Sequence, residues 1–103
     1  MNIPEKAFYS IFSSAYIFIE RAYEEMKKDN LTNAKYWLNR ILIKLNNSVS
    51  SNNKELIPCY NKECLDLVLN LTDKVNSILN TNIKDEKTYK EISSTLLNII
   101  QNF

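Results

Sequence analysis

The stretch AFYSIFSSAYIFIERAY, residues 7–23, decides the fold class of this chain. Its apolar residues return at spacings of three and four, which is the period of an α-helix that buries one face. Six aromatic rings lie in this stretch, and they occupy more than one stripe of such a helix. A helix with so wide an apolar surface either packs against neighbours on two sides or offers part of that surface to a partner.

Periodicity predicts four helices in the whole chain. The first runs from about Pro4 to Lys28, and the second begins after Asn30, a suitable N-cap. The third begins near Pro58, and the fourth follows Asp85, another capping residue. Because the connection KKDN, residues 27–30, is short, the first two helices should be antiparallel neighbours. The sequence therefore predicts an all-α fold, an antiparallel up-down four-helix bundle.

Length and composition favour one folded domain spanning residues 1–103. The hydrophobic share of 45% and the charged share of 24% are typical of globular proteins. A net charge of +1 predicts no binding to nucleic acid or to anionic membranes. No signal peptide is apparent, and the longest apolar run, residues 15–19, is too short to span a bilayer. We therefore expect a cytosolic protein, a monomer or a weak dimer.

The absence of His and Gly excludes many active sites. Without His there is no imidazole base or metal ligand, and without Gly there is no phosphate-cradling loop or nucleophile elbow. The carboxylates lack the Glu-x-x-His element of metal-binding bundles, and the Cys59–Cys64 spacing suits neither zinc nor a disulfide within one helix. We expect no enzyme activity, cofactor or metal, and two reduced thiols.

Several apolar residues lie beside the predicted core stripes. Tyrosines recur every seven residues on one flank of the first helix, and a phenol hydroxyl favours a rim or groove over a sealed core. Further apolar residues lie beside the stripes of the second and third helices. The residues predicted to bind a partner are Tyr9, Tyr16, Tyr23, Ile43, Leu65 and Leu69.

The chain resembles the FliS family of flagellin export chaperones. The segment PEKAFYSIFSSAYIFIERA, residues 4–22, keeps the Pro-Glu opening and the family's apolar and Ala positions. The acidic turn recurs at Asp29, and the family's Leu-x-x-Ala-Asn-Ile segment recurs as residues 78–83. Phe103 stands where the family usually has Trp.

This resemblance implies an all-α bundle and a particular function. Members of the family bind the disordered C-terminal segment of flagellin, which folds into helices along the chaperone. Binding prevents premature polymerisation and keeps the subunit competent for type III export, and the family also contacts the flagellar export gate. The surplus apolar surface would then be the docking groove for flagellin.

Two other functions are compatible with the residues. A bacteriocin immunity protein is also a small cytosolic helical bundle that acts by binding. A helical adaptor for a folded partner would likewise need exposed apolar side chains.

Overall fold

A computed structural model describes residues 3–49 and 62–102 of the chain. Its four helices are α1 (Ile3–Lys27), α2 (Leu31–Val49), α3 (Lys62–Asn80) and α4 (Glu86–Asn102). The described residues contain no strand, so the predicted all-α four-helix fold is confirmed. The predicted start of the third helix near Pro58 and the thiol of Cys59 lie outside the described residues.

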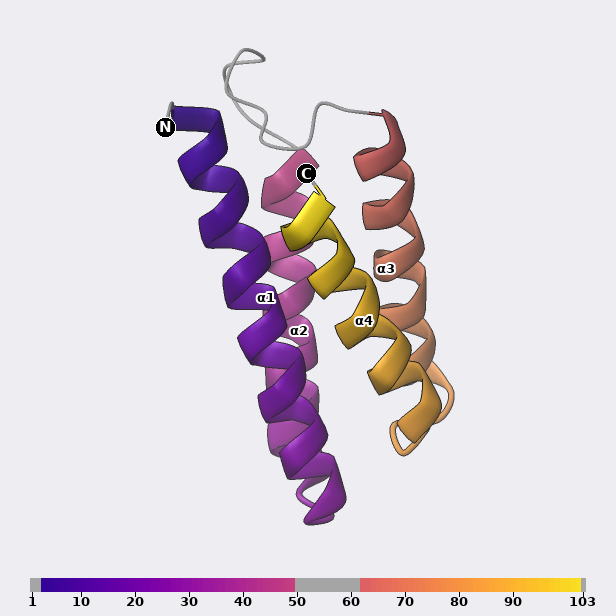
Figure 1. Cartoon of the computed structure of the whole chain (residues 1–103). Coiled ribbons are helices and arrows are strands. Elements are labelled where there is room, and N and C mark those ends of the chain that lie inside the picture. The colour runs from indigo at the N-terminus through magenta and orange to yellow at the C-terminus, as the bar shows by residue number, and fades with distance from the viewer. Residues whose placement is uncertain (1–2, 50–61, 103) are drawn as a thin grey trace.

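The helices form a ring of four neighbours (Figure 1). Helix α1 contacts α2 and α4, and α3 contacts the same two helices from the opposite corner. Successive helices run in opposite directions (Figure 1). Side-chain pairs agree with this: Phe18 and Arg40 meet across α1 and α2, and Tyr23 near the end of α1 meets Glu86 at the start of α4. Hence α1 and α3 lie on a diagonal of the bundle.

One stripe of each helix fills the core between the four helices. The spacing of three and four places these residues on a single face, as the sequence predicts. Leu38, Leu71 and Leu96, which lie on the stripes of α2, α3 and α4, are all fully buried. Ser48 also lies in the core, where its hydroxyl donates a hydrogen bond to the Leu45 carbonyl at 2.6 Å. This bond satisfies the hydroxyl within its own helix turn, which is why a polar residue can end the stripe of α2.

The turn between α1 and α2 reverses the chain without a glycine. Asp29 has a φ of 63°, the left-handed conformation that usually follows a helix end. The Asn30 N–H bonds to the Glu25 carbonyl at 2.8 Å, and the Asp29 N–H bonds to the Met26 carbonyl at 2.9 Å. This pair of bonds is a Schellman motif, with Asp in place of the usual Gly. It aligns α2 closely against α1.

Helix α4 begins at the predicted cap. One carboxylate oxygen of Asp85 accepts the Thr88 N–H at 3.3 Å, and the other accepts the Thr88 hydroxyl at 2.7 Å. Such a cap stabilises a helix by about 1 kcal/mol. Tyr89 follows directly, and its hydroxyl donates to the Ile83 carbonyl at 2.8 Å. These bonds tie the start of α4 to the turn that precedes it.

Candidate functional site

The six residues predicted to bind a partner lie on three different helices. Tyr9, Ile43 and Leu69 are exposed, while Tyr16, Tyr23 and Leu65 are partly buried against the core. The tyrosines belong to α1 and the leucines to α3, which do not contact each other. The structure therefore distributes these residues over several faces of the bundle. Their role in partner binding stays a prediction.

The tyrosine flank of α1 faces α4. The Tyr23 hydroxyl donates a hydrogen bond to the Glu86 carboxylate, and its ring lies 6.0 Å from the ring of Tyr89. The hydrogen bond to this carboxylate raises the pKa of Tyr23, and the same bond lowers the pKa of Glu86. Tyr16 and Tyr9 continue this flank toward the start of α1, one and two heptads before Tyr23. At least one of the predicted tyrosines thus has a structural partner within the bundle.

On α3, Leu65 and Leu69 lie on the flank opposite to that of Lys74. The side chain of Lys74 contacts Glu91 of α4. Helical spacing places Leu65 and Leu69 one turn apart on the flank that turns toward α2. Leu69 is 53% exposed. Ile43 points outward from α2 and is 60% exposed, the highest value among the exposed large apolar side chains of the described residues.

A cluster of rings and guanidiniums covers the outer face of the α1–α2 pair, and we call it the aromatic–arginine cluster. It consists of Phe18, Arg21, Tyr36, Trp37 and Arg40. The rings of Phe18 and Trp37 pack across the two helices with centroids 5.3 Å apart, and the Tyr36 ring stands edge-on to Trp37 at 5.1 Å. These contacts join α1 to α2 on the solvent side of the core.

Both arginines of the cluster lie over its rings. The Arg21 guanidinium is 5.4 Å from the Trp37 centroid, and the Arg40 guanidinium is 5.1 Å from Phe18 and 5.7 Å from Tyr36. The Arg40 Nη1 also donates to the Tyr36 hydroxyl at 3.3 Å. At these distances cation–π attraction orients both guanidiniums. Two exposed apolar residues lie one helix turn from these arginines: Ile17 is four residues before Arg21, and Ile43 is three residues after Arg40.

Sequence reasoning missed this cluster as a unit. Trp37 and Ile43 are recognisable as residues outside the core stripe of α2, and Tyr36 and Arg40 have the i,i+4 spacing of neighbours on a helix. The link to Phe18 and Arg21 depends on how α1 and α2 align across their turn. That alignment is a tertiary property, since periodicity within one helix does not show which residue of the next helix is opposite.

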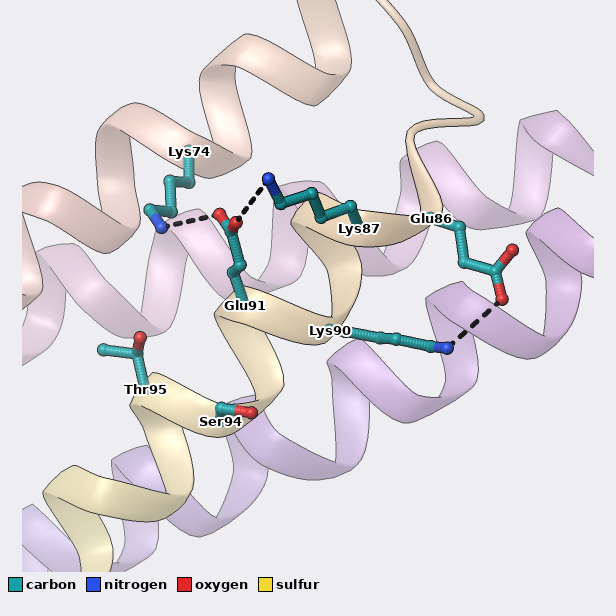
Figure 2. Close-up of a pocket in the computed structure, with 7 residues that line it drawn as sticks. All are labelled: Lys74, Glu86, Lys87, Lys90, Glu91, Ser94 and Thr95. Carbon is teal, nitrogen blue, oxygen red and sulfur yellow. Dashed lines mark hydrogen bonds and ion pairs between the residues drawn. The ribbon is translucent and has the colours of Figure 1, made fainter.

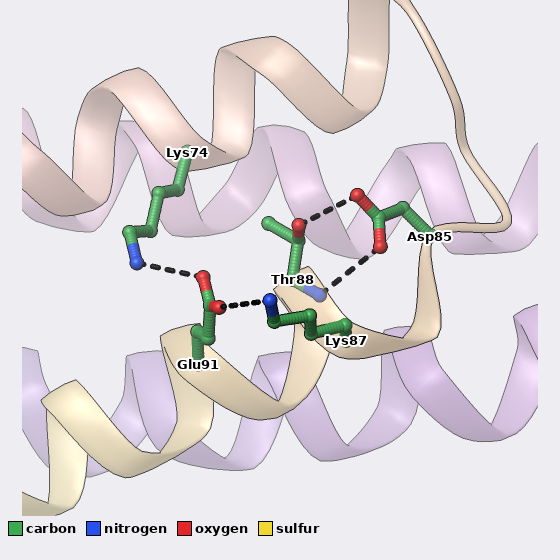
Figure 3. A network of polar contacts seen from close by, with 5 residues as sticks. All are labelled: Lys74, Asp85, Lys87, Thr88 and Glu91. Atoms are coloured by element: carbon green, nitrogen blue, oxygen red, sulfur yellow. Dashed lines mark hydrogen bonds and ion pairs between the residues drawn. The ribbon is translucent and has the colours of Figure 1, made fainter.

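The opposite corner of the bundle carries a shallow charged depression of about 650 Å³ (Figure 2). Three lysines and two glutamates line it, and ion pairs join Lys74 to Glu91 at 2.8 Å and Lys90 to Glu86 at 3.6 Å. The Lys87 Nζ also forms a longer ion pair with Glu91, at 4.0 Å, beside the Asp85 cap (Figure 3). The hydrogen bond from Lys74 is the main cause of the lowered pKa of Glu91. We interpret the side chains that line this depression as a structural ion-pair network, in which Lys74 and Glu91 join α3 to α4.

Acid should weaken this network. Because the pKa values of Glu86 and Glu91 are lowered in the folded state, their contribution to stability is present above the ordinary value of 4.5 and is lost as pH falls below it. We expect Glu91→Gln to be less stable than the wild type at neutral pH and equally stable in acid. Urea unfolding across this range measures both, and a difference that persists unchanged in acid would contradict the assignment.

In comparisons with known proteins, no family model, curated protein or solved structure matches this chain. Among the described residues, no helix combines the length and apolarity needed to cross a membrane. The described residues also bring together no group of three or more Cys, Asp or Glu side chains suited to a metal ion.

Proposed function

We propose that this protein is a cytosolic export chaperone that binds the disordered C-terminal segment of flagellin on its outer apolar surface. The observation that supports this function best is the exposure of large aliphatic side chains on the bundle, with Ile17, Ile43 and Leu69 each at least half exposed. These three residues lie on α1, α2 and α3, so a client segment that contacts all of them has to wrap around the bundle. The resemblance of residues 4–22 to flagellin chaperones supplies the identity of the client.

Docking would couple binding to folding of the client. An extended chain that becomes an amphipathic helix places an apolar residue every three or four positions, which suits exposed apolar residues spaced along one helix. On α2, Tyr36 and Ile43 are seven residues apart and therefore share one outer line of the helix. Burial of client and anchors drives association, and ordering of the client opposes it. The client is thereby kept from polymerising.

Calorimetric titration of the C-terminal peptide of the source organism's flagellin tests the proposal. We expect wild type to bind it, and Ile43→Glu and Leu69→Glu each to bind at least about tenfold more weakly, since a desolvated anchor contributes about 2 kcal/mol or more. Both residues are exposed, so the stability of the variants should change by only about 0.5 kcal/mol.

The matched control is Asn70→Glu, which adds the same charge at an exposed polar position beside Leu69. It should bind the peptide like wild type. Absence of binding heat with wild type would refute flagellin as the client. Unfolding of both Glu variants would show instead that Ile43 and Leu69 are needed for the fold.

A further inference from the structure

The aromatic–arginine cluster presents two guanidiniums that form no ion pair with another described side chain. The ion pairs between described side chains, which belong to residues 8–49 and 62–102, each include a residue from Lys84 to Glu91, far from the cluster in the sequence. Neither Arg21 nor Arg40 has a carboxylate partner among them. A guanidinium carries five N–H donors in its plane, and stacking on a ring uses its face and leaves the donors at its edge for a ligand.

Contacts within the protein already orient both guanidiniums, so less side-chain entropy is lost when their N–H donors bind a ligand. Arg40 is held by two rings and by its bond to the Tyr36 hydroxyl, and Arg21 is held over Trp37. An arginine that is oriented before binding loses less side-chain entropy when a carboxylate arrives. A carboxylate matches the guanidinium fork with two parallel hydrogen bonds.

Apolar side chains adjoin both charges. Ile17 lies one turn before Arg21 on α1, and Ile43 lies one turn after Arg40 on α2. Ile17 is 50% exposed and Tyr36 is 52% exposed. A ligand that covers this face therefore meets apolar surface and cationic groups alternately. That pattern matches a helix with carboxylates beside its apolar stripe.

We propose that the aromatic–arginine cluster, with Ile17 and Ile43, is a docking site for an acidic amphipathic helix of a protein partner, and that Arg21 and Arg40 select the carboxylates of that helix. The proposal deepens the proposed function, on which it rests for the assumption that a client segment docks on this surface. It adds a charge requirement for the segment. Nucleic acid is disfavoured, because phosphate backbones are bound through many cations and the net charge of the chain is only +1.

The single tryptophan of the chain makes the test specific, because the fluorescence of Trp37 reports on the cluster alone. The probes are three synthetic helices of about 18 residues, long enough to be helical when bound. All carry the same Leu stripe, flanked by Glu in the first peptide, Gln in the second and Lys in the third. We expect the Glu peptide to change the Trp37 emission on binding, and the Gln peptide to bind about tenfold more weakly, since hydrogen bonds to charged groups contribute about 1.5 kcal/mol or more.

Variants of the full-length chain assign the selectivity to the two arginines. In Arg21→Gln and Arg40→Gln, the preference for the Glu peptide over the Gln peptide should fall several-fold, and in the double variant it should vanish. Arg40→Lys keeps the charge without the planar fork and should retain part of the preference. Lys87→Gln removes an exposed charge from the far corner of the bundle and should behave like wild type. Circular dichroism of each variant verifies that the bundle is folded.

Equal affinity of wild type for the Glu and Gln peptides would overturn the proposal, as would an unchanged preference in the double variant. Tighter binding of a single-stranded oligonucleotide than of the Glu peptide would replace it with a nucleic-acid site. Binding of the Glu peptide without binding of the flagellin peptide would refute only the client. Binding of the flagellin peptide with no effect of the arginine variants and no charge preference would refute only this inference.

Discussion

Replacing Leu71 by Ala is expected to lower the free energy of unfolding by about 2 to 5 kcal/mol. Leu71 is fully buried at the middle of α3, within the core between the helices. Truncation removes its apolar contacts and leaves a cavity that closely packed neighbours fill only in part. A domain of this size has a total stability of about 5 to 15 kcal/mol, so the loss is a large share of it.

Leu69 provides the matched control for Leu71. It is the same residue type, two positions earlier on the same helix, and it is 53% exposed. We expect Leu69→Ala to change the free energy of unfolding by only about 0.5 kcal/mol. Urea unfolding followed by circular dichroism measures both variants. Equal losses of stability in Leu71→Ala and Leu69→Ala would contradict the placement of Leu71 in the core and Leu69 on the surface.

Replacing Tyr89 by Ala should destabilise the bundle by about 3 to 5 kcal/mol, in the range of other large aromatic truncations. Its ring is only 1% exposed and lies beside Tyr23 of α1, while its hydroxyl donates to the Ile83 carbonyl before α4. The residue therefore secures α4 to α1 and to the preceding turn at once. Tyr89→Phe keeps the ring and removes the hydrogen bond, so it should cost about 1 kcal/mol.

Thermal and urea unfolding of the two Tyr89 variants separate packing from hydrogen bonding. An alkaline titration adds an independent readout. Burial raises the pKa of Tyr89 from 10.0 to about 12, because the charged phenolate is poorly solvated in the core. The resulting stability is present below the ordinary pKa of 10.0 and is lost as pH rises through about 12. The alkaline loss should be smaller in Tyr89→Phe, and an identical loss in both proteins would contradict the assignment.

Much of the fold was predictable from local patterns. The stripe Phe12, Ala15, Ile19 and Ala22 is visible in the sequence as spacings of three and four, and all four residues are buried. The start of α4 was equally predictable, because Asp85 can bond backbone N–H groups one turn ahead, and it bonds Thr88. In both cases the determining contacts join residues within one or two helix turns.

The candidate site was predictable only in part. Ile43 and Leu69 could be assigned to the surface, since each falls outside the core stripe of its own helix. Tyr23 could not be distinguished from a free rim tyrosine, because its partner Glu86 is 63 residues away. The same holds for Trp37, whose contacts with Phe18 and Arg21 cross from α2 to α1.

The sequence by itself therefore determined which face of each helix is buried, where α2 and α4 begin, and that the fold is all-α. Only the tertiary structure decided which flanks meet: Tyr23 with Glu86, Lys74 with Glu91, and Phe18 with Trp37. The physical reason is that side-chain periodicity orients residues about the axis of their own helix. The neighbour on each flank depends on the order and axial alignment of helices around the bundle, which packing of the whole core and the turns between helices set together.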